Sequence, residues 1–329
     1  MTVIELSENQ KSKYDDFVEN HPLGNIHQLW DFGQFQTTTK GRSKKWVLAL
    51  TEDENIKAGA LIVRQDLPLN KCWLYCVRGP LLNYDNKEQS AQLFAEIATL
   101  ASRENAIYLR IDPPIENLPE NLPKSRKAHA HYQPESTLII DLQPSEEEIL
   151  SQMKPKGRYN IKVAKKHGVT VRTSTKAEEF YEILKETTQR DHFSGHPLTY
   201  YENMLSHLGP KRAKLYVAEH EGKVLAGVIA TYFRDTVTYY FGASSSEKRN
   251  VMAPYLLHFQ IMKDAKKDGY KFYDMFGIAP ENQPRHAWAG VTDFKLKFGG
   301  RRVNYTPARE IIYNPFWYVL MKLAKLVRR

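Results

Sequence analysis

One order of strands and helices occurs twice along this chain, and this repetition limits the possible fold more than any other feature. In the first half, short segments rich in β-branched and aromatic residues predict strands at 46–53, 56–65 and 72–79. Apolar residues at helical spacing predict a helix over 86–105, and a strand that ends at prolines follows at 106–114. Three strands, a helix and a further strand therefore form the first unit.

The second half of the chain repeats this order. Residues 213–244 contain three predicted strands, which are joined by tight Glu-Gly and Arg-Asp turns. A helix is predicted over 253–269, with a glycine as its stop, and a strand over 270–278 follows it. The repeated order resembles the core of the GNAT acyltransferase fold. We therefore expect an α/β (α+β) protein with two tandem GNAT-like domains.

Length, charge and cysteine content narrow the class of protein. A chain of 329 residues is long enough for two domains, and we expect 1–141 with 308–329 in the first and 142–307 in the second. The formal net charge of +9 indicates a polyanionic partner, either nucleic acid, a nucleotide or an anionic membrane surface. Cys72 and Cys76 are the two cysteines, and they are interpreted as reduced core thiols because further zinc ligands are missing.

The sequence contains no recognisable targeting or membrane-spanning segment. The first ten residues, MTVIELSENQ, lack the charged and then apolar pattern of a secretory signal. No run approaches the roughly 18 apolar residues that a bilayer span requires. We therefore expect a cytoplasmic protein.

A GNAT-like fold suggests acetyl-CoA as the acyl donor, and the loops that would bind it can be inspected. The pyrophosphate of CoA is usually held by a glycine-rich loop at a helix N-terminus. The corresponding loop of the second repeat, 244–255, has no glycine, and in the first repeat, 78–90, the one glycine precedes a proline. A CoA-linked donor is therefore disfavoured, and we expect neither an organic cofactor nor a metal.

Several segments of the chain resemble one known family. They are YCVRGPLL (75–82), YLRIDPP (108–114), KGRYNIKVAKKHGV (156–169), YYFGASS (239–245), APYLLHFQIMKDAKKDGYKFYDMFGI (253–278) and FKLKFGG (294–300). In order and spacing they resemble the FemABX family of peptidoglycan aminoacyltransferases, and the resemblance covers nearly the whole chain.

This resemblance implies a reaction and two substrates. FemABX enzymes transfer an amino acid from aminoacyl-tRNA to the side-chain amine of a peptidoglycan precursor, which builds the interpeptide bridge. Large members insert a helical hairpin in the second domain, but residues 170–290 show no sustained heptad pattern. The chain is thus similar to the short form, and we expect a monomer that acts on lipid II or on UDP-MurNAc-pentapeptide.

The resemblance also implies a catalytic pair, Phe294 and Lys295. An ester carbonyl that is attacked by an amine develops negative charge on its oxygen, and a fixed cation nearby lowers that barrier. The alternative is a helical turn with Phe294 and Phe298 buried and with Lys295 and Lys297 exposed to solvent.

Substrate-binding positions of the short form fall on Gln36, His196, Tyr200, Tyr240 and Phe241. At three of them the polar group of the family is weakened or lost. A lysine that binds nucleotide diphosphate is replaced by Gln36, an arginine by His196 and a tyrosine by Phe241. These changes disfavour the soluble UDP-linked precursor without disfavouring the family.

A basic segment precedes the second repeat. Residues 154–169 contain six lysines and arginines and no acid, whereas a solvated helix face normally mixes charges of both signs. This segment and a later arginine pair are candidates for binding the phosphates of tRNA or of the precursor, and Tyr159 for stacking on a base. The candidate phosphate ligands are Lys154, Lys156, Arg158, Lys162, Arg301 and Arg302. The alternative is a partly buried helix with ordinary surface lysines.

The last segment, 314–329, mixes aromatic, aliphatic and basic residues. This composition is typical of a helix that lies on an anionic membrane, so we expect the inner face of the cytoplasmic membrane as a peripheral location. The alternative is a terminal helix that packs on the first domain.

Two other functions remain open. The first is an N-acyltransferase of the same fold with CoA or another donor. The second is a protein without catalytic activity that binds tRNA or a membrane surface. Asp112 and Asp274 follow or end predicted strands, but both are interpreted as residues that cap turns, so the sequence identifies no general base.

Overall fold

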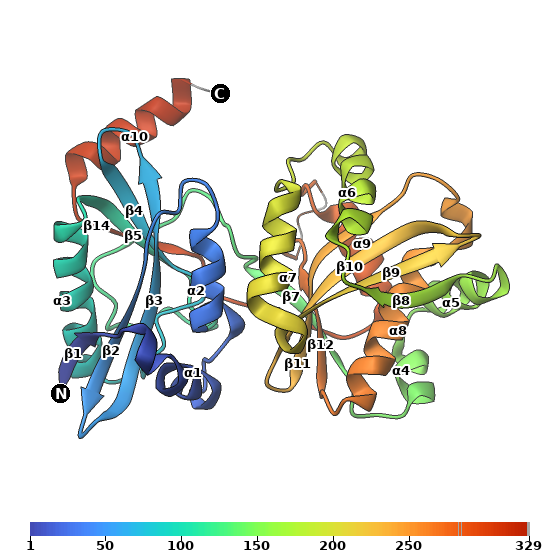
Figure 1. The fold of residues 1–329 in the computed structure, drawn as a ribbon, viewed down its shortest axis with the longest axis horizontal. Helices are drawn as coiled ribbons and strands as arrows, with labels where there is room; N and C mark the ends of the chain where they lie inside the picture. The colour runs from blue at the N-terminus through green and yellow to red at the C-terminus, as the bar shows by residue number, and fades with distance from the viewer. Residues whose placement is uncertain (282, 284, 328–329) are drawn as a thin grey trace. The chain divides into compact units, whose positions relative to one another are not determined.

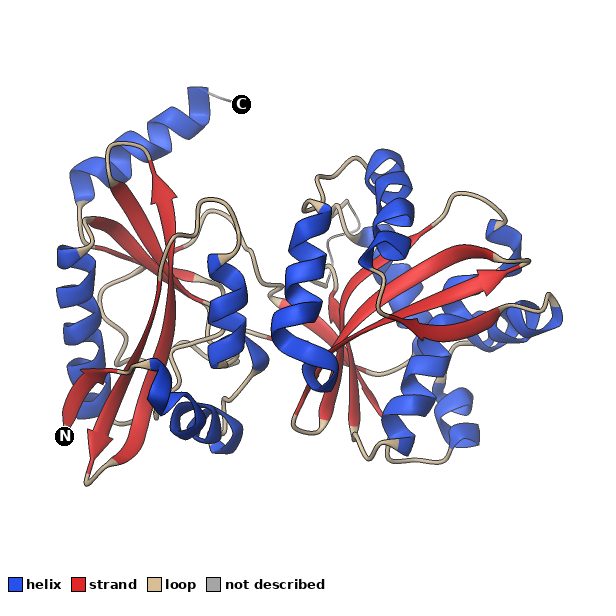
Figure 2. Ribbon diagram, in the orientation of Figure 1, coloured by secondary structure: helices blue, strands red, loops and turns tan. Residues whose placement is uncertain are grey.

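A computed structural model describes residues 1–281, 283 and 285–327, with the backbone alone for 325–327. The chain forms two compact units (Figure 1). Unit 1 consists of Met1–Glu135 and Tyr305–Arg329, and unit 2 of Ser136–Asn304. In both units, helices cover a sheet on its two faces (Figure 2).

Unit 1 is built on a seven-stranded sheet with the order β1-β2-β3-β4-β5-β14-β6. Its strands are β1 (Thr2–Glu5), β2 (Lys45–Glu52), β3 (Asn55–Leu67), β4 (Lys71–Cys76), β5 (Ala106–Ile111), β6 (Arg126–Lys127) and β14 (Arg309–Ile312). Neighbouring strands are antiparallel except for the parallel pair β4 and β5, which helix α3 (Lys87–Arg103) connects.

The helices of unit 1 bury apolar side chains on each face of this sheet. Helix α3 covers one face with Leu93, Ile97 and Leu100, which pack on a core formed by β2–β5. Helices α1 (Lys11–Asn20) and α2 (Trp30–Thr37) lie on the other side of the sheet (Figure 1). Short 3-10 turns η1 (Glu8–Gln10) and η2 (Ile26–Gln28) precede them, and helix α10 (Pro315–Val327) follows β14.

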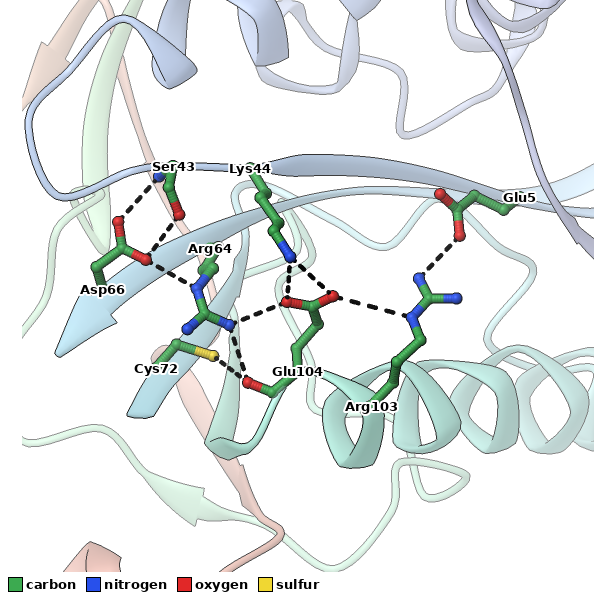
Figure 3. A network of polar contacts seen from close by, with 8 residues as sticks. All are labelled: Glu5, Ser43, Lys44, Arg64, Asp66, Cys72, Arg103 and Glu104. Carbon is green, nitrogen blue, oxygen red and sulfur yellow. Dashed lines mark hydrogen bonds and ion pairs between the residues drawn. The ribbon is translucent and has the colours of Figure 1, made fainter. Parts of the chain in front are cut away.

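A network of charged side chains connects the C-terminal end of α3 to the sheet (Figure 3). The half-buried Glu104 accepts hydrogen bonds from Lys44 Nζ at 2.9 Å and from Arg64 Nη1 at 3.0 Å, and Arg64 Nε reaches Asp66 at 2.8 Å. The Cys72 thiol donates to the Glu104 carbonyl at 3.4 Å, and burial raises the pKa of this thiol to about 11. Both cysteines are free and buried, which agrees with the prediction of core thiols.

Unit 2 repeats the topology of unit 1 in a sheet with the order β13-β7-β12-β11-β10-β9-β8. Its strands are β7 (Ser136–Asp141), β8 (Thr170–Ser174), β9 (Ala213–His220), β10 (Lys223–Phe233), β11 (Thr236–Ser244), β12 (Phe272–Gly277) and β13 (Arg301–Asn304). As in unit 1, three antiparallel strands are followed by a helix, α8 (Ala253–Lys267), and by a strand parallel to the third. The strand and helix order predicted twice from the sequence is therefore confirmed.

Helices again cover the second sheet. They are α4 (Glu146–Gln152), α5 (Pro155–Lys166), α6 (Ala177–Asp191), α7 (Leu198–Arg212), α8 and α9 (Ala289–Lys295), with 3-10 turns η3 (Arg249–Val251) and η4 (Leu296–Phe298). Helix α8 packs with α4 and α5 on one core. Gly227 of β10 lies against Phe180 and Ile183 of α6, which are not part of that core.

The limits of the two units differ from the expected domain boundaries of 141/142 and 307/308. Residues 136–141 were expected in the first domain, but they form β7, which pairs with β12 and β13 of the second sheet. Residues 305–307 belong to unit 1, because the Tyr305 backbone N–H donates to the Glu135 carbonyl and that of Thr306 to the Ile115 carbonyl. The short strand β7 has no strong periodicity to reveal its partners.

Candidate active site

Two parallel strands of unit 2 separate near their C-terminal ends. β11 and β12 pair only over Thr236–Thr238 and Phe272–Asp274. Beyond these residues β11 continues to Ser244 and β12 to Gly277 without pairing with each other. The backbone groups on the facing edges therefore form no ladder hydrogen bonds with each other, and the side chains there are not held by strand pairing.

A β-bulge in β11 distributes consecutive aromatic residues over both faces of the sheet. Tyr239 pairs with Ala230 and Phe241 with Ile229, so Tyr240 is the extra residue. Residues two apart in a regular strand share a face, but one inserted residue reverses this. Tyr239 consequently packs on the α8 side, and Phe241 faces α7.

A second bulge lies at the end of β12. Asp274 pairs with Ile139 and Gly277 with Thr137, so two residues of β12, Met275 and Phe276, lie opposite one residue of β7, Leu138. Phe276 within the bulge has a φ of 59°, a left-handed conformation that is rare for a bulky side chain. The Asp274 carboxylate holds this shape, because it accepts hydrogen bonds from the Phe276 backbone N–H at 2.7 Å and from the Thr137 hydroxyl.

Aromatic side chains line the two bulges. The rings of Tyr240 and Phe276 stack with centroids 5.3 Å apart. Phe241 lies 4.9 Å from Tyr240 and 6.1 Å from Tyr200, and His196 stacks on Tyr200 at 3.8 Å. All but the buried Tyr200 are partly accessible to solvent. The structure thus brings together four of the predicted substrate-binding residues and adds Phe276, which the sequence analysis missed.

Lys295 directs its ammonium group into unit 2. Its side chain is buried, Nζ donates to the Gly277 carbonyl at 2.7 Å and Nζ lies 4.9 Å from the centre of the Tyr239 ring. Burial lowers the pKa of Lys295 from 10.5 to about 8, and the nearby Asp274 partly opposes this. The alternative with an exposed Lys295 is therefore wrong. The second bulge thus lies beside a buried ammonium group whose pKa is lowered to about 8.

A neutral histidine and Phe294 pack beside this lysine. His258 lies 4.4 Å from the Tyr239 ring, and its Nδ1 is 2.8 Å from the Tyr273 hydroxyl. Burial, together with the Lys295 charge, lowers the pKa of His258 to about 3. Phe294 is half-buried between Tyr255, His258 and Phe298, so it contributes packing around the lysine. Tyr239 and His258 lie in segments that resemble the family, but the sequence analysis assigned them no role, because their proximity to Lys295 is a tertiary contact.

Comparisons with known proteins cover both units. A family model described as an acetyltransferase (GNAT) domain matches residues 153–295, and one described as the FemAB family matches residues 10–122. A lipid II:glycine glycyltransferase of Staphylococcus haemolyticus (strain JCSC1435) is 25% identical over 87% of this chain and 88% of the relative. The chain is thus similar to FemAB-family proteins along most of its length, and the FemAB family model itself matches part of unit 1.

Two further comparisons agree with this similarity in extent and in fold. A lipid II:glycine glycyltransferase of Staphylococcus aureus is 22% identical over 95% of this chain and 94% of the relative. A crystal structure of FemX superposes with a TM-score of 0.85 and 21% identity, covering 97% of this chain and 99% of that one. The family resemblance and the tandem GNAT-like fold expected from the sequence are both confirmed.

The basic segment forms the solvent-facing side of helix α5. Lys154, Lys156 and Lys162 are exposed, and their side chains form no ion pair or hydrogen bond within the described part of the chain. Tyr159 is 66% exposed beside them. Arg158 differs, because its Nη1 donates to the Ser151 and Met153 carbonyls at the end of α4.

Three other predicted site residues lie elsewhere or have protein partners. Gln36 is buried in α2 of unit 1, where it accepts a hydrogen bond from Arg42. Arg302 donates to the Ala279 carbonyl at 3.0 Å and supports the segment that follows β12. Arg301, its neighbour on β13, is exposed.

Both candidate carboxylates hold backbone turns. Asp112 is buried and accepts hydrogen bonds from the Tyr75 hydroxyl at 2.5 Å and the Arg78 N–H at 2.6 Å. Burial raises the pKa of Asp112 although Arg78 opposes the shift. Asp274 holds the β12 bulge in the same way. In the described part of the chain, no group of three or more His, Cys, Asp or Glu side chains is arranged to hold a metal ion.

Substituting Gly242 by alanine is expected to disturb the site. A Cβ at Gly242 would lie 2.0 Å from the Tyr239 hydroxyl, so the ring that contacts Lys295 would have to move. We expect Gly242→Ala to lower the free energy of unfolding by about 1–3 kcal/mol, measured by denaturant titration. Gly290→Ala is the matched control, because a Cβ there meets no atom within 4 Å. Equal stability of the two variants would contradict this description of Tyr239.

Proposed function

We propose that this protein is an aminoacyltransferase that moves an amino acid from aminoacyl-tRNA to the side-chain amine of a peptidoglycan precursor. The match to the FemAB family model supports the enzyme class, and the names of the staphylococcal relatives support lipid II as the acceptor. The GNAT-like fold of unit 2 supports acyl transfer, while the missing glycines of its 244–255 loop favour a donor other than CoA.

One observation carries the proposed chemistry: the buried Lys295 ammonium group at the separated ends of β11 and β12. The amine nitrogen attacks the carbonyl carbon of the aminoacyl ester, and the carbonyl oxygen becomes negative. The bond between the carbonyl carbon and the ribose oxygen then breaks, and the ribose oxygen takes the proton that the amine loses. An ammonium group has three N–H donors, so Lys295 can bond the Gly277 carbonyl and still donate to this oxygen.

Separate surfaces of unit 2 suit the two substrates. Lys154, Lys156 and Lys162 are exposed cations that form no ion pair within the described residues, and we assign them to the phosphates of tRNA, with Tyr159 available for stacking. The aromatic row from His196 to Phe276 offers apolar contacts near the reacting groups and no permanent cation for a diphosphate. This favours the lipid-linked precursor over the UDP-linked one.

A lipid-linked acceptor implies a location. We propose that the enzyme works as a monomer at the inner face of the cytoplasmic membrane, peripherally bound through the 314–329 segment. Within the described residues, the helices are too short or too polar to cross a bilayer.

A transfer assay tests the proposal. Purified protein is mixed with a charged tRNA pool and either lipid II or UDP-MurNAc-pentapeptide, and the precursor is analysed by mass spectrometry. We expect lipid II to gain the mass of an amino acid, and a gain on the soluble precursor alone would overturn the choice of acceptor. Transfer from acetyl-CoA and not from tRNA, or no transfer from any donor, would overturn the proposed activity.

The rate of transfer should depend on pH through Lys295. Below about pH 8 this side chain is charged, and kcat/KM should rise about tenfold per pH unit as the acceptor amine loses its proton. Above about pH 8 Lys295 itself loses its charge, so the rise should stop and a plateau should follow. The profile is measured from pH 6.5 to 9.5 with correction for uncatalysed hydrolysis of the ester. A rise that continues unchanged to pH 9.5 would contradict the assigned role.

A further inference from the structure

Helix α10 is apolar on two faces, and the fold of unit 1 covers only one of them. Tyr318 is 2% exposed and packs in a cluster with Trp73 and Tyr108 of the sheet. Trp317 and Met321 pack against the same cluster. This face explains why the helix is attached to unit 1, and it agrees with the alternative of a terminal helix packed on the first domain.

The other face of α10 presents large apolar side chains to solvent. Phe316 is 71% exposed, Val319 56%, Leu320 44% and Leu323 54%. Their spacing of three, four and seven residues places them in one stripe along the helix. Exposed apolar residues in such a stripe, rather than scattered singly, indicate a surface that has a partner.

A hairpin turn adds to this surface. Leu69, in the turn between β3 and β4, is 74% exposed. Two residues later, Lys71 Nζ lies 5.2 Å from the centre of the Trp317 ring, so the turn lies beside α10. Figure 1 shows the β3–β4 turn near the start of α10.

The surroundings of the stripe are basic. Residues 313–329 contain no acid. Lys322 Nζ lies 4.7 Å from the centre of the Tyr318 ring, and the charge of Arg126 is close enough to oppose the rise in the Tyr318 pKa that burial causes. Among the described residues, Lys71, Arg126 and Lys322 form no ion pair. Lys325, Leu326, Arg328 and Arg329, which also suggested a membrane helix, have side chains outside the described part.

We propose that the outward face of α10, together with Leu69, docks on a bilayer of anionic phospholipid. Apolar side chains enter the boundary between headgroups and acyl chains, while Lys71, Arg126 and Lys322 contact the negatively charged headgroups. A second copy of this chain is the weaker candidate, because pairing through α10 would bring these cations against their own copies. The inference adds a specific surface to the peripheral location proposed above, but it does not depend on the reaction.

Sedimentation with lipid vesicles tests the docking surface. The full chain is mixed with vesicles of phosphatidylcholine alone or with about 30% phosphatidylglycerol. We expect binding to the anionic vesicles, and we expect Phe316→Ser with Leu323→Ser to weaken it by tenfold or more. Lys322→Glu should weaken it about tenfold at low salt and less at high salt.

Controls separate docking from folding and from catalysis. Leu118→Ser with Val291→Ser removes two exposed apolar side chains from other segments and should leave binding unchanged. Lys295→Met should bind vesicles as the wild type does, so a failure of the proposed reaction can be distinguished from a failure of membrane docking. Equal binding by the wild type and the α10 variants at equal melting temperature would overturn the proposal. A dimer that the α10 variants dissociate, without vesicle binding, would overturn it in favour of a second copy.

Discussion

Replacing Lys295 by methionine is expected to lower kcat for aminoacyl transfer by about 10²–10³-fold and to leave the protein at least as stable as the wild type. The loss of activity follows because a fixed, buried cation near a developing oxyanion contributes roughly this factor. The unchanged or higher stability follows from burial, which lowers the pKa of Lys295 from 10.5 to about 8. This shift means that keeping the buried side chain charged costs the folded state about 3 kcal/mol, and methionine avoids this cost.

The sign of this effect gives a test that does not use activity. A base whose pKa is lower in the folded state binds fewer protons when folded, so the stability of the wild type should rise between pH 8 and 10.5. Methionine removes this dependence and also the hydrogen bond to Gly277, which we expect to cost about 1 kcal/mol. At pH 7 the variant should therefore gain about 1–2 kcal/mol in the free energy of unfolding, measured by urea titration.

A matched control is available in the same unit. Lys214 Nζ lies 4.7 Å from the centre of the Tyr232 ring, but Lys214 is half-buried and pairs with Asp268 at 3.6 Å. Lys214→Met should therefore leave kcat unchanged. If Lys295→Met retains kcat within about threefold of the wild type, the proposed role of Lys295 is wrong.

Replacing Lys154, Lys156 and Lys162 together by glutamine is expected to raise KM for aminoacyl-tRNA by about ten- to a hundredfold at low salt, with little change in kcat. These side chains are exposed on α5 without ion pairs in the described chain, so their removal should cost phosphate contacts and no folding energy. Glutamine and lysine have similar helix propensities, so α5 should persist. Steady-state kinetics at several salt concentrations measures the effect. The salt dependence of KM should become weaker by an amount that corresponds to the loss of two to three phosphate contacts.

Three exposed lysines of unit 1 serve as the control for net charge. Lys13, Lys40 and Lys87 are all exposed, and their replacement by glutamine lowers the net charge by the same amount. This control should leave KM for aminoacyl-tRNA within about twofold of the wild type. Equal effects of the two triple variants would show that overall charge, and not helix α5, attracts the tRNA.

Much of the fold could be predicted because it rests on local patterns. The twofold order of strands and the α3 and α8 helices follow from alternating or helical apolar spacing, which the sequence displays directly. The partners of β7 could not be predicted, because its six residues alternate only partly between polar and apolar and would fit either sheet. The bulges of β11 and β12 were also missed, because an inserted residue is visible only when the opposing strand is known.

The candidate site shows the same division. Lys295 and the aromatic positions from His196 to Phe241 were suggested by motif resemblance, which reports residue types in order along the chain. His258, Tyr239 and Phe276 lie in the same family-like segments, but their order along the chain assigns them no role, and only folding places them beside Lys295 and Tyr240. Arg158 and Arg302 were predicted to bind phosphate because they are basic. In the structure both donate hydrogen bonds to backbone carbonyl groups, and the number of charges in a segment does not reveal such bonds.

By itself, the sequence determined the class of fold, the family and the basic character of α5, since these depend on composition and on spacing between near neighbours. The tertiary structure decided the protonation equilibrium of Lys295 and the exposure of the second apolar face of α10. Both depend on which atoms exclude water from a side chain, and those atoms come from segments that are distant in the sequence.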